Sequence, residues 1–365
     1  IPTFDFFDLM FSLFLPPILA ASYYIFRNRL NFEINTNFGL VFITMFFVYS
    51  FLFAPLLTIS DPNYQFNQRI ARLISPFESI KYLEKNESDK TNGSFNYKNR
   101  IYFSSYSVLE DSIKVFQGRN QTIYNKRQIV FSDQKPKVFD TFLPFGTDDY
   151  GRCVYSRIIY GTRISISIGA LSVFISFLVG LFLGHLAGIA GGITDKFLSR
   201  ISDLFLAVPI IFFILFLLIS FGNNFFTIVM VLGFSGWMSI FKLVKDETTK
   251  AKNYDFISTS RQLGFDSLYI LIKDYFPIII IPVTTNLVFQ FANVILAESA
   301  LSFLGLGISL EEPSWGAMIR SGQGYLNQAW WLIFFPSLTF VSLLITLKIL
   351  GEKLVQHLNP ILNDN

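Results

Sequence analysis

Apolar stretches of roughly 20 residues recur along this chain of 365 residues, and each is long enough, alone or with its flanks, to cross a lipid bilayer as a helix. Charged residues make up only 15% of the chain, against about 25% in an ordinary soluble domain. We therefore predict an all-α polytopic membrane protein with six core transmembrane helices, at Phe38–Ile59, Ile164–Ile189, Ile201–Ser220, Phe225–Ile240, Pro277–Leu301 and Trp330–Leu350.

A further apolar segment, residues 1–37, precedes the first predicted span. It is long enough to cross the bilayer, but it holds Asp8 and the pair Pro16 and Pro17, and proline breaks a helix. We expect it to lie at the membrane interface, with a seventh span as the alternative. No basic stretch precedes the apolar residues, so a cleaved signal peptide is not expected.

Lysine and arginine residues gather in alternate short loops, and this asymmetry orients the spans. We expect these loops, and the tail at 351–365, to lie in the cytoplasm. The basic residues concerned are Arg27, Arg29, Lys196, Arg200, Lys242, Lys245, Lys250, Lys252, Arg261, Lys273, Lys348 and Lys353.

On this topology residues 60–163 lie outside the cell membrane, and they are too many for a simple connection. They contain polar runs and short alternating runs such as "RIYFSSYSV" and "RQIVFSD". We predict an extracytoplasmic insert with some β-structure, followed by a segment that leads into the second span.

The sequence offers no motif of an enzyme active site. It lacks the phosphate-binding G-x-x-x-x-G-K-[ST] loop, G-x-S-x-G and H-E-x-x-H. Its single cysteine, Cys153, allows no intrachain disulfide or cysteine cluster, and its net charge of +3 is too small to indicate nucleic acid. We expect a protein that is not an enzyme and binds no cofactor.

A charged segment, Asp255–Pro277, lies between the fourth and fifth predicted spans. Asp255 is expected to cap a short helix at 256–263, which Gly264 ends. A second short helix is expected at 267–276, capped by Asp266, and Pro277 opens the next span at a position where proline is tolerated.

The whole loop, 246–276, is longer than a connection needs. The pattern alone leaves two interpretations open, a docking surface for a partner and an amphipathic connector on the membrane.

Several motifs, taken in order, resemble the permease subunits of bacterial ABC importers of the dipeptide/oligopeptide type. Gly264, thirteen residues before Pro277, resembles the glycine of that family's cytoplasmic "EAA" loop. The other matching segments are "FAPLLTISDP" (Phe53–Pro62), "FGTDDYGRCVYSRIIYGTRISISIG" (Phe145–Gly169), "GGITDKFLSRISDLFLAVP" (Gly191–Pro209) and "AESALSFLGLGISLEEPSWGAMI" (Ala297–Ile319).

The resemblance implies a five-helix permease core at 164–350, joined by the first span and working by alternating access in the bacterial inner membrane. It implies as partners a second homologous permease, two P-loop ATPase subunits and an extracytoplasmic peptide-binding protein. The helix at 255–263 would couple the spans to the ATPase. The candidate coupling residues are Asp255, Phe256, Ile257, Ser258, Arg261, Leu263, Gly264 and Phe265.

One departure concerns the coupling helix, where the family's Glu-Ala-Ala is replaced by Ser258-Thr259-Ser260. Docking through that glutamate is therefore not implied for this chain.

A polar stripe marks the fifth span. Asn286, Gln290 and Asn293 follow the spacing i, i+4, i+7 on one helix face, and Glu298 lies near the outer end. Such a stripe either lines a hydrated path or forms interhelical hydrogen bonds. We predict the translocation path.

Three other functions compete with peptide import. The same permease type could carry nickel or another small solute. An ion-coupled secondary transporter would need carboxylates at the membrane midplane, which the spans almost lack. A membrane scaffold would make the insert its working part.

Overall fold

The computed structural model of the chain describes residues 38–86, 99–132, 135–308 and 312–358. The predicted interfacial segment at 1–37 lies outside the described residues. The chain forms two compact units, one of residues 1–163 and 311–339 and the other of residues 164–310 and 340–365.

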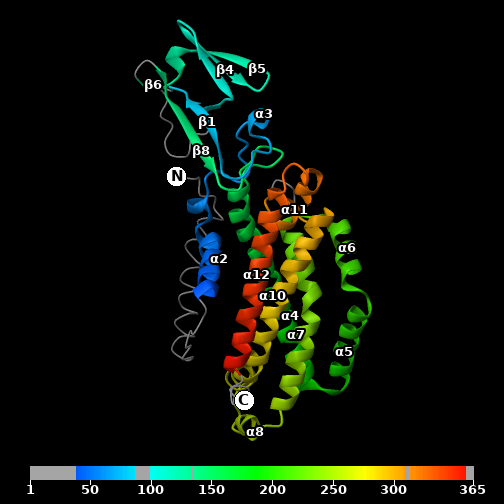
Figure 1. The fold of residues 1–365 in the computed structure, drawn as a ribbon. Helices are drawn as coiled ribbons and strands as arrows, with labels where there is room; N and C mark the ends of the chain where they lie inside the picture. Colours follow the sequence, from blue (N-terminus) through cyan, green and yellow to red (C-terminus); the bar gives the residue numbers. More distant parts are fainter. Residues whose placement is uncertain (1–37, 87–98, 133–134, 309–311, 359–365) are drawn as a thin grey trace. The chain divides into compact units, whose positions relative to one another are not determined.

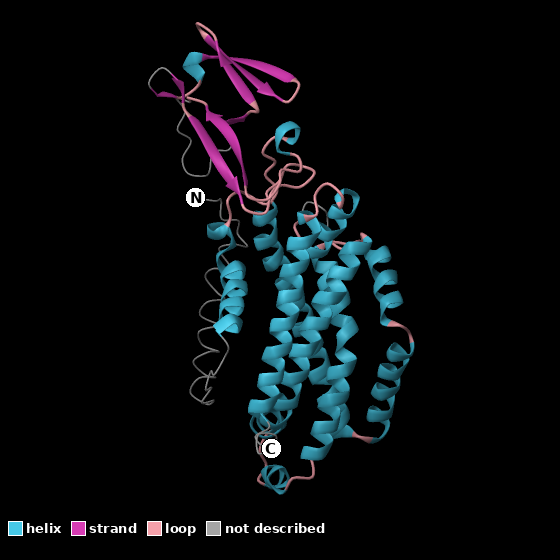
Figure 2. Ribbon diagram, viewed as in Figure 1, coloured by secondary structure: helices cyan, strands magenta, loops and turns pink. Residues whose placement is uncertain are grey.

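Helices dominate the fold, as Figures 1 and 2 show. They are α2 Phe38–Leu57, α3 Gln68–Ala71, α4 Val154–Ala190, α5 Gly192–Ala207, α6 Ile210–Phe221, α7 Phe225–Ala251, α8 Asp255–Gln262, α9 Ser267–Ile270, α10 Phe276–Leu304, α11 Trp315–Gly322 and α12 Trp331–Leu358. Among the described residues, three short turns accompany them, η2 Lys126–Gln128, η3 Leu271–Tyr275 and η4 Gln323–Tyr325.

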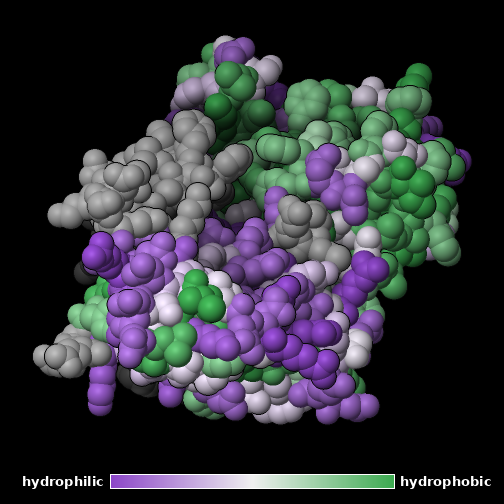
Figure 3. All heavy atoms as spheres, turned by 90° about the horizontal axis from the view of Figure 1, so that it is seen from above, coloured by the Kyte–Doolittle hydropathy of each residue, from purple (hydrophilic) through white to green (hydrophobic). Residues whose placement is uncertain are grey.

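In the described part of the chain, four helical stretches are long and apolar enough to cross a membrane. They are Val154–Ala190, Phe225–Ala251, Ser267–Leu304 and Trp331–Val355. Wide apolar areas lie on the surface, shown in green in Figure 3. Large apolar side chains such as Phe182 and Phe216 are exposed. These features confirm the predicted helical, multi-pass fold.

The predicted third span, Ile201–Ser220, is not one straight helix. It is divided between α5 and α6, which meet at a bend of 87°. Pro209 explains the break, because proline forces the preceding residue out of the helical region and Val208 accordingly has φ −91° and ψ 129°. The pair counts as a fifth candidate span if both halves belong to one crossing.

The predicted first span corresponds to α2, which is also irregular. Phe53 leaves the helical region, with φ −119° and ψ 27°, and Pro55 follows two residues later. Proline donates no backbone hydrogen bond, so the last turn of α2 cannot continue regularly.

Close helix packing in the second unit depends on a row of small residues. Gly180, Gly184 and Gly188 recur every four residues along α4, and each faces α7. A Cβ at Gly184 would lie 2.7 Å from the backbone oxygen of Phe241, which is closer than real Cβ atoms approach. A stripe of this kind lets two membrane helices approach closely.

The described part of the insert contains three small antiparallel sheets, drawn in magenta in Figure 2. Their strand orders are β2-β1-β8, β3-β4-β5 and β6-β7. Leu83, Ile113 and Ile129 are buried together, so the strands have their own apolar core. The strands are β1 Glu78–Glu84, β2 Arg100–Tyr102, β3 Ser105–Val108, β4 Ser112–Gln117, β5 Asn120–Asn125, β6 Phe131–Ser132, β7 Lys135–Pro136 and β8 Val138–Leu143.

Candidate functional site

The predicted coupling helix is present as α8, Asp255–Gln262, one residue earlier than expected at each end. Asp255 is not its N-cap; the capping position is Tyr254, which makes no side-chain cap bond. Asp255 occupies the first turn instead, where its negative charge is favourable near the helix N-terminus. Its backbone oxygen accepts bonds from the hydroxyls of Ser258 and Thr259, at 2.7 and 2.9 Å.

Gly264 ends this helix as predicted. Its φ is +81°, in the left-handed region that other residues rarely adopt. The amide of Gly264 donates to Arg261 O and the amide of Phe265 donates to Ser260 O, at 3.1 and 3.3 Å. This pair of bonds is a Schellman motif, which fixes the direction of the chain leaving the helix.

The second short helix is not separate from the fifth span. Asp266 caps α9 as predicted, accepting from Leu268 N at 3.3 Å. The helix then continues through the π-turn η3 into α10, where Phe276 N donates to Leu271 O. Pro277 accounts for the wider turn, because it has no N–H and its ring would crowd the carbonyl four residues back.

Apolar side chains of this loop are exposed in the chain alone. Phe256, Leu263 and Phe265 have 51%, 70% and 46% of their surface accessible. Ile257 behaves differently: it is fully buried and packs with Val244 and other residues of the second unit. The structure therefore presents three of the four predicted apolar coupling residues at the surface and uses Ile257 to hold α8.

Arg261 has a partner within the chain. Its Nη2 donates to the hydroxyl of Tyr275 at 2.9 Å.

The predicted polar stripe lines one cavity. Asn286, Gln290 and Asn293 of α10 face Ser235, Gly236 and Ser239 of α7 and two isoleucines of α6 around a space of about 280 Å³. The rest of the lining is apolar. The full set of residues around the cavity is Ile210, Ile214, Leu232, Ser235, Gly236, Ser239, Asn286, Phe289, Gln290, Asn293, Val294 and Ala297.

Two side-chain amides tie α10 to α7 beside this cavity. Gln290 Nε2 donates to Gly236 O at 3.2 Å, and Asn286 Nδ2 donates to Ser239 Oγ at 3.3 Å. The carbonyl oxygens of both amides are buried without a hydrogen-bond partner. A Cβ at position 236 would lie 2.1 Å from Gln290 Nε2, so a larger residue there would displace this side-chain amide.

Glu298 is not part of the cavity lining. It is fully buried, and it accepts from Ser302 Oγ at 2.7 Å and from Ser165 Oγ of α4 at 3.4 Å. The structure thus separates Glu298 from the three residues with which the sequence grouped it.

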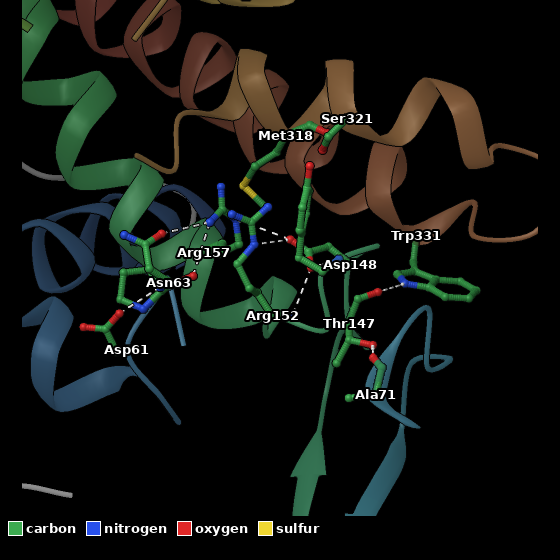
Figure 4. A network of polar contacts seen from close by, with 12 residues as sticks. Asp61, Asn63, Ala71, Thr147, Asp148, Arg152, Arg157, Met318, Ser321 and Trp331 are labelled. Carbon is green, nitrogen blue, oxygen red and sulfur yellow. Dashed lines mark hydrogen bonds and ion pairs between the residues drawn. The ribbon is translucent and has the colours of Figure 1, made fainter. Parts of the chain in front are cut away.

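A buried ionic network, which the sequence analysis did not predict, lies in the first unit (Figure 4). Asp148 accepts from Arg152 Nε at 2.7 Å and from the backbone amides of Tyr150 and Arg152 at 2.9 and 2.8 Å. Arg157 Nε lies 3.9 Å from the same carboxylate. Arg157 also donates to Pro62 O at 3.2 Å.

The residue before Asp148 extends this network. Trp331 Nε1 donates to Thr147 O at 3.1 Å, and the Thr147 hydroxyl donates to Ala71 O (Figure 4). The i, i+4 spacing of Asp148 and Arg152 was a readable signal for the pair. Nothing in the sequence indicated that the pair is buried.

Comparison with known proteins agrees with the resemblance of the motifs. A family described as "Binding-protein-dependent transport system inner membrane component" matches residues 178–363. The dipeptide transport system permease protein DppC of Bacillus subtilis is 34% identical over 218 residues, covering 59% of this chain and 68% of that protein. The oligopeptide transport system permease protein OppC of Bacillus subtilis is 31% identical over 216 residues, covering 59% and 71%.

Among solved structures, a chain of the MetNI methionine ABC transporter in an inward-facing conformation superposes with a TM-score of 0.46 at 16% sequence identity. The match covers 55% of this chain and 96% of that chain.

Proposed function

Because the chain belongs to the family of binding-protein-dependent transport system inner membrane components, we propose that it is the permease subunit of an ATP-driven peptide importer. Its relatives named above are permeases for dipeptides and oligopeptides, and this supports peptides as the substrate class. The complete importer contains a second homologous permease, two P-loop ATPase subunits and an extracytoplasmic peptide-binding protein.

The observation that carries the proposal is the exposed apolar surface of α8 and its flanks. Phe256, Leu263 and Phe265 lie on an ordered loop whose geometry is fixed by the Gly264 turn. Exposed apolar groups clustered on a rigid element are typical of a protein contact. The sequence has no phosphate-binding loop of its own, so the partner that docks here supplies ATP hydrolysis.

The candidate coupling residues divide the work between them. Phe256, Leu263 and Phe265 contact the ATPase, and Ser258 lies on the same helix between them. Ile257 anchors α8 to the chain's own core, and Asp255 stabilises its first turn. Gly264 sets the angle of the helix.

The translocation path runs along the cavity between α6, α7 and α10. Asn286, Gln290 and Asn293 supply its polar groups, and neutral amides and hydroxyls suit a peptide backbone, which carries both donors and acceptors. Glu298 supports the wall of this path by joining α10 to α4 through Ser165. Movement of α7 against α10 opens and closes the cavity during alternating access.

Reconstitution tests the proposed function. The purified chain, co-expressed with the partner subunits, is expected to bring down a P-loop ATPase and to support ATP-dependent uptake of labelled peptides into proteoliposomes. Uptake of Ni²⁺ but not of peptides would show that the substrate is a small cation. Uptake driven by an ion gradient without ATP, or no uptake at all, would overturn the importer function.

A substitution at the Gly264 turn tests the docking loop directly. Gly264→Val is expected to misdirect α8, because a β-branched residue is strained at φ +81° while no neighbouring atom lies within 4 Å of the new Cβ. The variant should insert into the membrane yet lose the ATPase subunit or its stimulation. Ser258→Glu, which restores the residue usual in the family, is the tolerated control. Normal transport by Gly264→Val would make the loop a passive connector.

A further inference from the structure

The contact between Arg261 and Tyr275 lies where the coupling helix meets the spans. Arg261 is in the last turn of α8, and Tyr275 is the last residue of the π-turn η3 that leads into α10. Their hydrogen bond is 2.9 Å long, and Tyr275 is fully buried. A bond from a charged donor contributes more than a neutral one, so this contact is directional as well as strong.

Tyr275 continues the contact into two other helices. Its ring meets the ring of His185 of α4 edge-on, with centroids 5.0 Å apart. His185 Nδ1 in turn lies 3.4 Å from Thr248 Oγ1 of α7. Thr248 is fully buried against Gly188, where an added Cβ would lie 2.7 Å from the Thr248 Cβ. Three helices therefore meet around one tyrosine ring.

The π-turn sets the direction of the Tyr275 side chain, which points toward α4 and α7. A π-turn holds more residues than an ordinary helical turn, so it changes which residue faces inward. It is a less stable conformation, and next to Tyr275 the Oδ2 atom of Asp274 is buried without a hydrogen-bond partner. Rare turns of this kind cluster at functional sites.

The coupling helix has few other attachments. It has eight residues, too few to persist as an isolated helix in water. Ile257 holds it through apolar packing, which resists separation but fixes no angle. The Gly264 turn sets the angle at which the chain leaves the helix, and the Arg261–Tyr275 bond adds a directional contact between the last turn of α8 and the start of α10.

We propose that Arg261, Tyr275 and His185 form a joint that transmits movement of α8 to α4, α7 and α10. Arg261 and Tyr275 are then positioning residues for coupling, acting within the chain rather than as contacts with the ATPase. The inference rests on the proposed function, since it concerns how the state of the ATPase reaches the spans.

A double-mutant cycle in the assembled importer tests the joint. The variants are Tyr275→Phe, which removes only the hydroxyl, Arg261→Gln, and both together. The measurement is the stimulation of ATP hydrolysis by loaded binding protein. Each single variant should lose stimulation about tenfold, the factor that corresponds to one hydrogen bond to a charged group. The double variant should lose no more than either single one.

A matched control and a second measurement separate the joint from simple loss of structure. Tyr269→Phe removes a hydroxyl from the same loop, where the ring is exposed and stacks on Phe265, and it should leave stimulation unchanged. Amide hydrogen exchange over 255–262 should become faster in Tyr275→Phe than in Tyr269→Phe.

Independent, additive losses from Arg261→Gln and Tyr275→Phe would assign Arg261 to the ATPase interface and overturn the joint. Faster amide exchange in Tyr275→Phe without any loss of ATPase stimulation would show that the bond only stabilises α8. That result would also overturn the joint. Absence of stimulation in the unaltered complex would instead overturn the proposed function, and the inference with it.

Discussion

Two loops of the molecule handle polar and apolar groups in opposite ways. The segment 145–157, which includes the first turn of α4, buries three charged side chains. Asp148, Arg152 and Arg157 are paired with one another and with backbone groups. The loop around α8 exposes Phe256, Leu263 and Phe265. The three charges of the first segment are paired within the chain. The second leaves apolar side chains exposed in the chain alone, and these are the ones that the proposed ATPase contact would cover.

The largest expected effect follows from breaking the buried network. Asp148→Ala leaves Arg152 and Arg157 without their carboxylate, and removing one partner of a buried ion pair costs about 3–5 kcal/mol. Denaturant titration in detergent, followed by tryptophan fluorescence, measures the loss.

The neighbouring residue provides the control for this change. One carboxylate oxygen of Asp149 is buried without a hydrogen-bond partner, so Asp149→Ala should change the free energy of unfolding by less than about 1 kcal/mol. Equal losses at the two positions would show that the network contributes no special stability.

A smaller effect, of a different kind, is expected in the coupling loop. The double variant Phe256→Ala/Leu263→Ala removes exposed side chains, so the free energy of unfolding should stay within about 0.5 kcal/mol of the original. Binding of the ATPase subunit should weaken by more than about 1–2 kcal/mol, as for truncated interface anchors. Titration of the two proteins in nanodiscs measures the affinity. Unchanged affinity would remove the contrast between the two loops.

Cysteine labelling sharpens the same contrast without large energetic effects. Cys153 is fully buried and burial raises the pKa of its thiol, so a maleimide should not label the native chain. Leu263→Cys places a thiol at a position that is 70% exposed, and it should react at least about tenfold faster. Addition of the ATPase subunit should protect it. Rapid labelling of Cys153 in the folded chain would contradict the burial of its segment.

The smallest expected effect is a pH dependence. Burial, together with the neighbouring charge of Asp148, raises the pKa of the Asp149 carboxyl above its usual 3.8. Just above that pH the folded chain holds more protons than the unfolded one, so this group lowers stability as pH rises through the window. Asp149→Asn should abolish that decline, as seen in melting temperatures measured from pH 3 to 7. A steeper fall of the melting temperature with pH in Asp149→Asn would contradict the raised pKa of Asp149.

The positions of the helices followed from the sequence, because apolar length is a local property. The ends of the helices did not. The predicted Phe225–Ile240 covers only the core of α7, which continues to Ala251. In the added part, Lys242 and Lys245 pair with Asp203 and Asp195 of α5, at 2.9 and 3.0 Å. Pro209 was a visible signal for a break in the third span, but the prediction was made from apolar length and did not use it.

The candidate site was predictable where a single helix face carried the signal. Asn286, Gln290 and Asn293 were grouped by helical spacing, and they line one cavity. Glu298 shares their helix but not their surroundings: it is fully buried and accepts hydrogen bonds from Ser302 and from Ser165 of α4. The partner of Arg261 could not be predicted, because the π-turn sets the direction of Tyr275 and no spacing rule anticipates it.

The glycine stripe of α4 is a signal that the sequence contained and the predictions did not use. A spacing of four small residues indicates a close helix contact. It does not identify the partner helix, which only the structure assigns to α7.

The continuity of α10 has a mechanical consequence. The helix α10 begins next to the π-turn and carries the side-chain amides beside the cavity, so it can act as a lever between the two. From Phe276 to Gln290 it rises about 21 Å, at about 1.5 Å per residue. A tilt of about 10° at the π-turn displaces Gln290 by about 4 Å over that length. A displacement of this size is far more than the hydrogen bond of 3.2 Å from Gln290 Nε2 to Gly236 O can follow, so a small rotation at one end is enough to break this bond between α10 and α7 at the other.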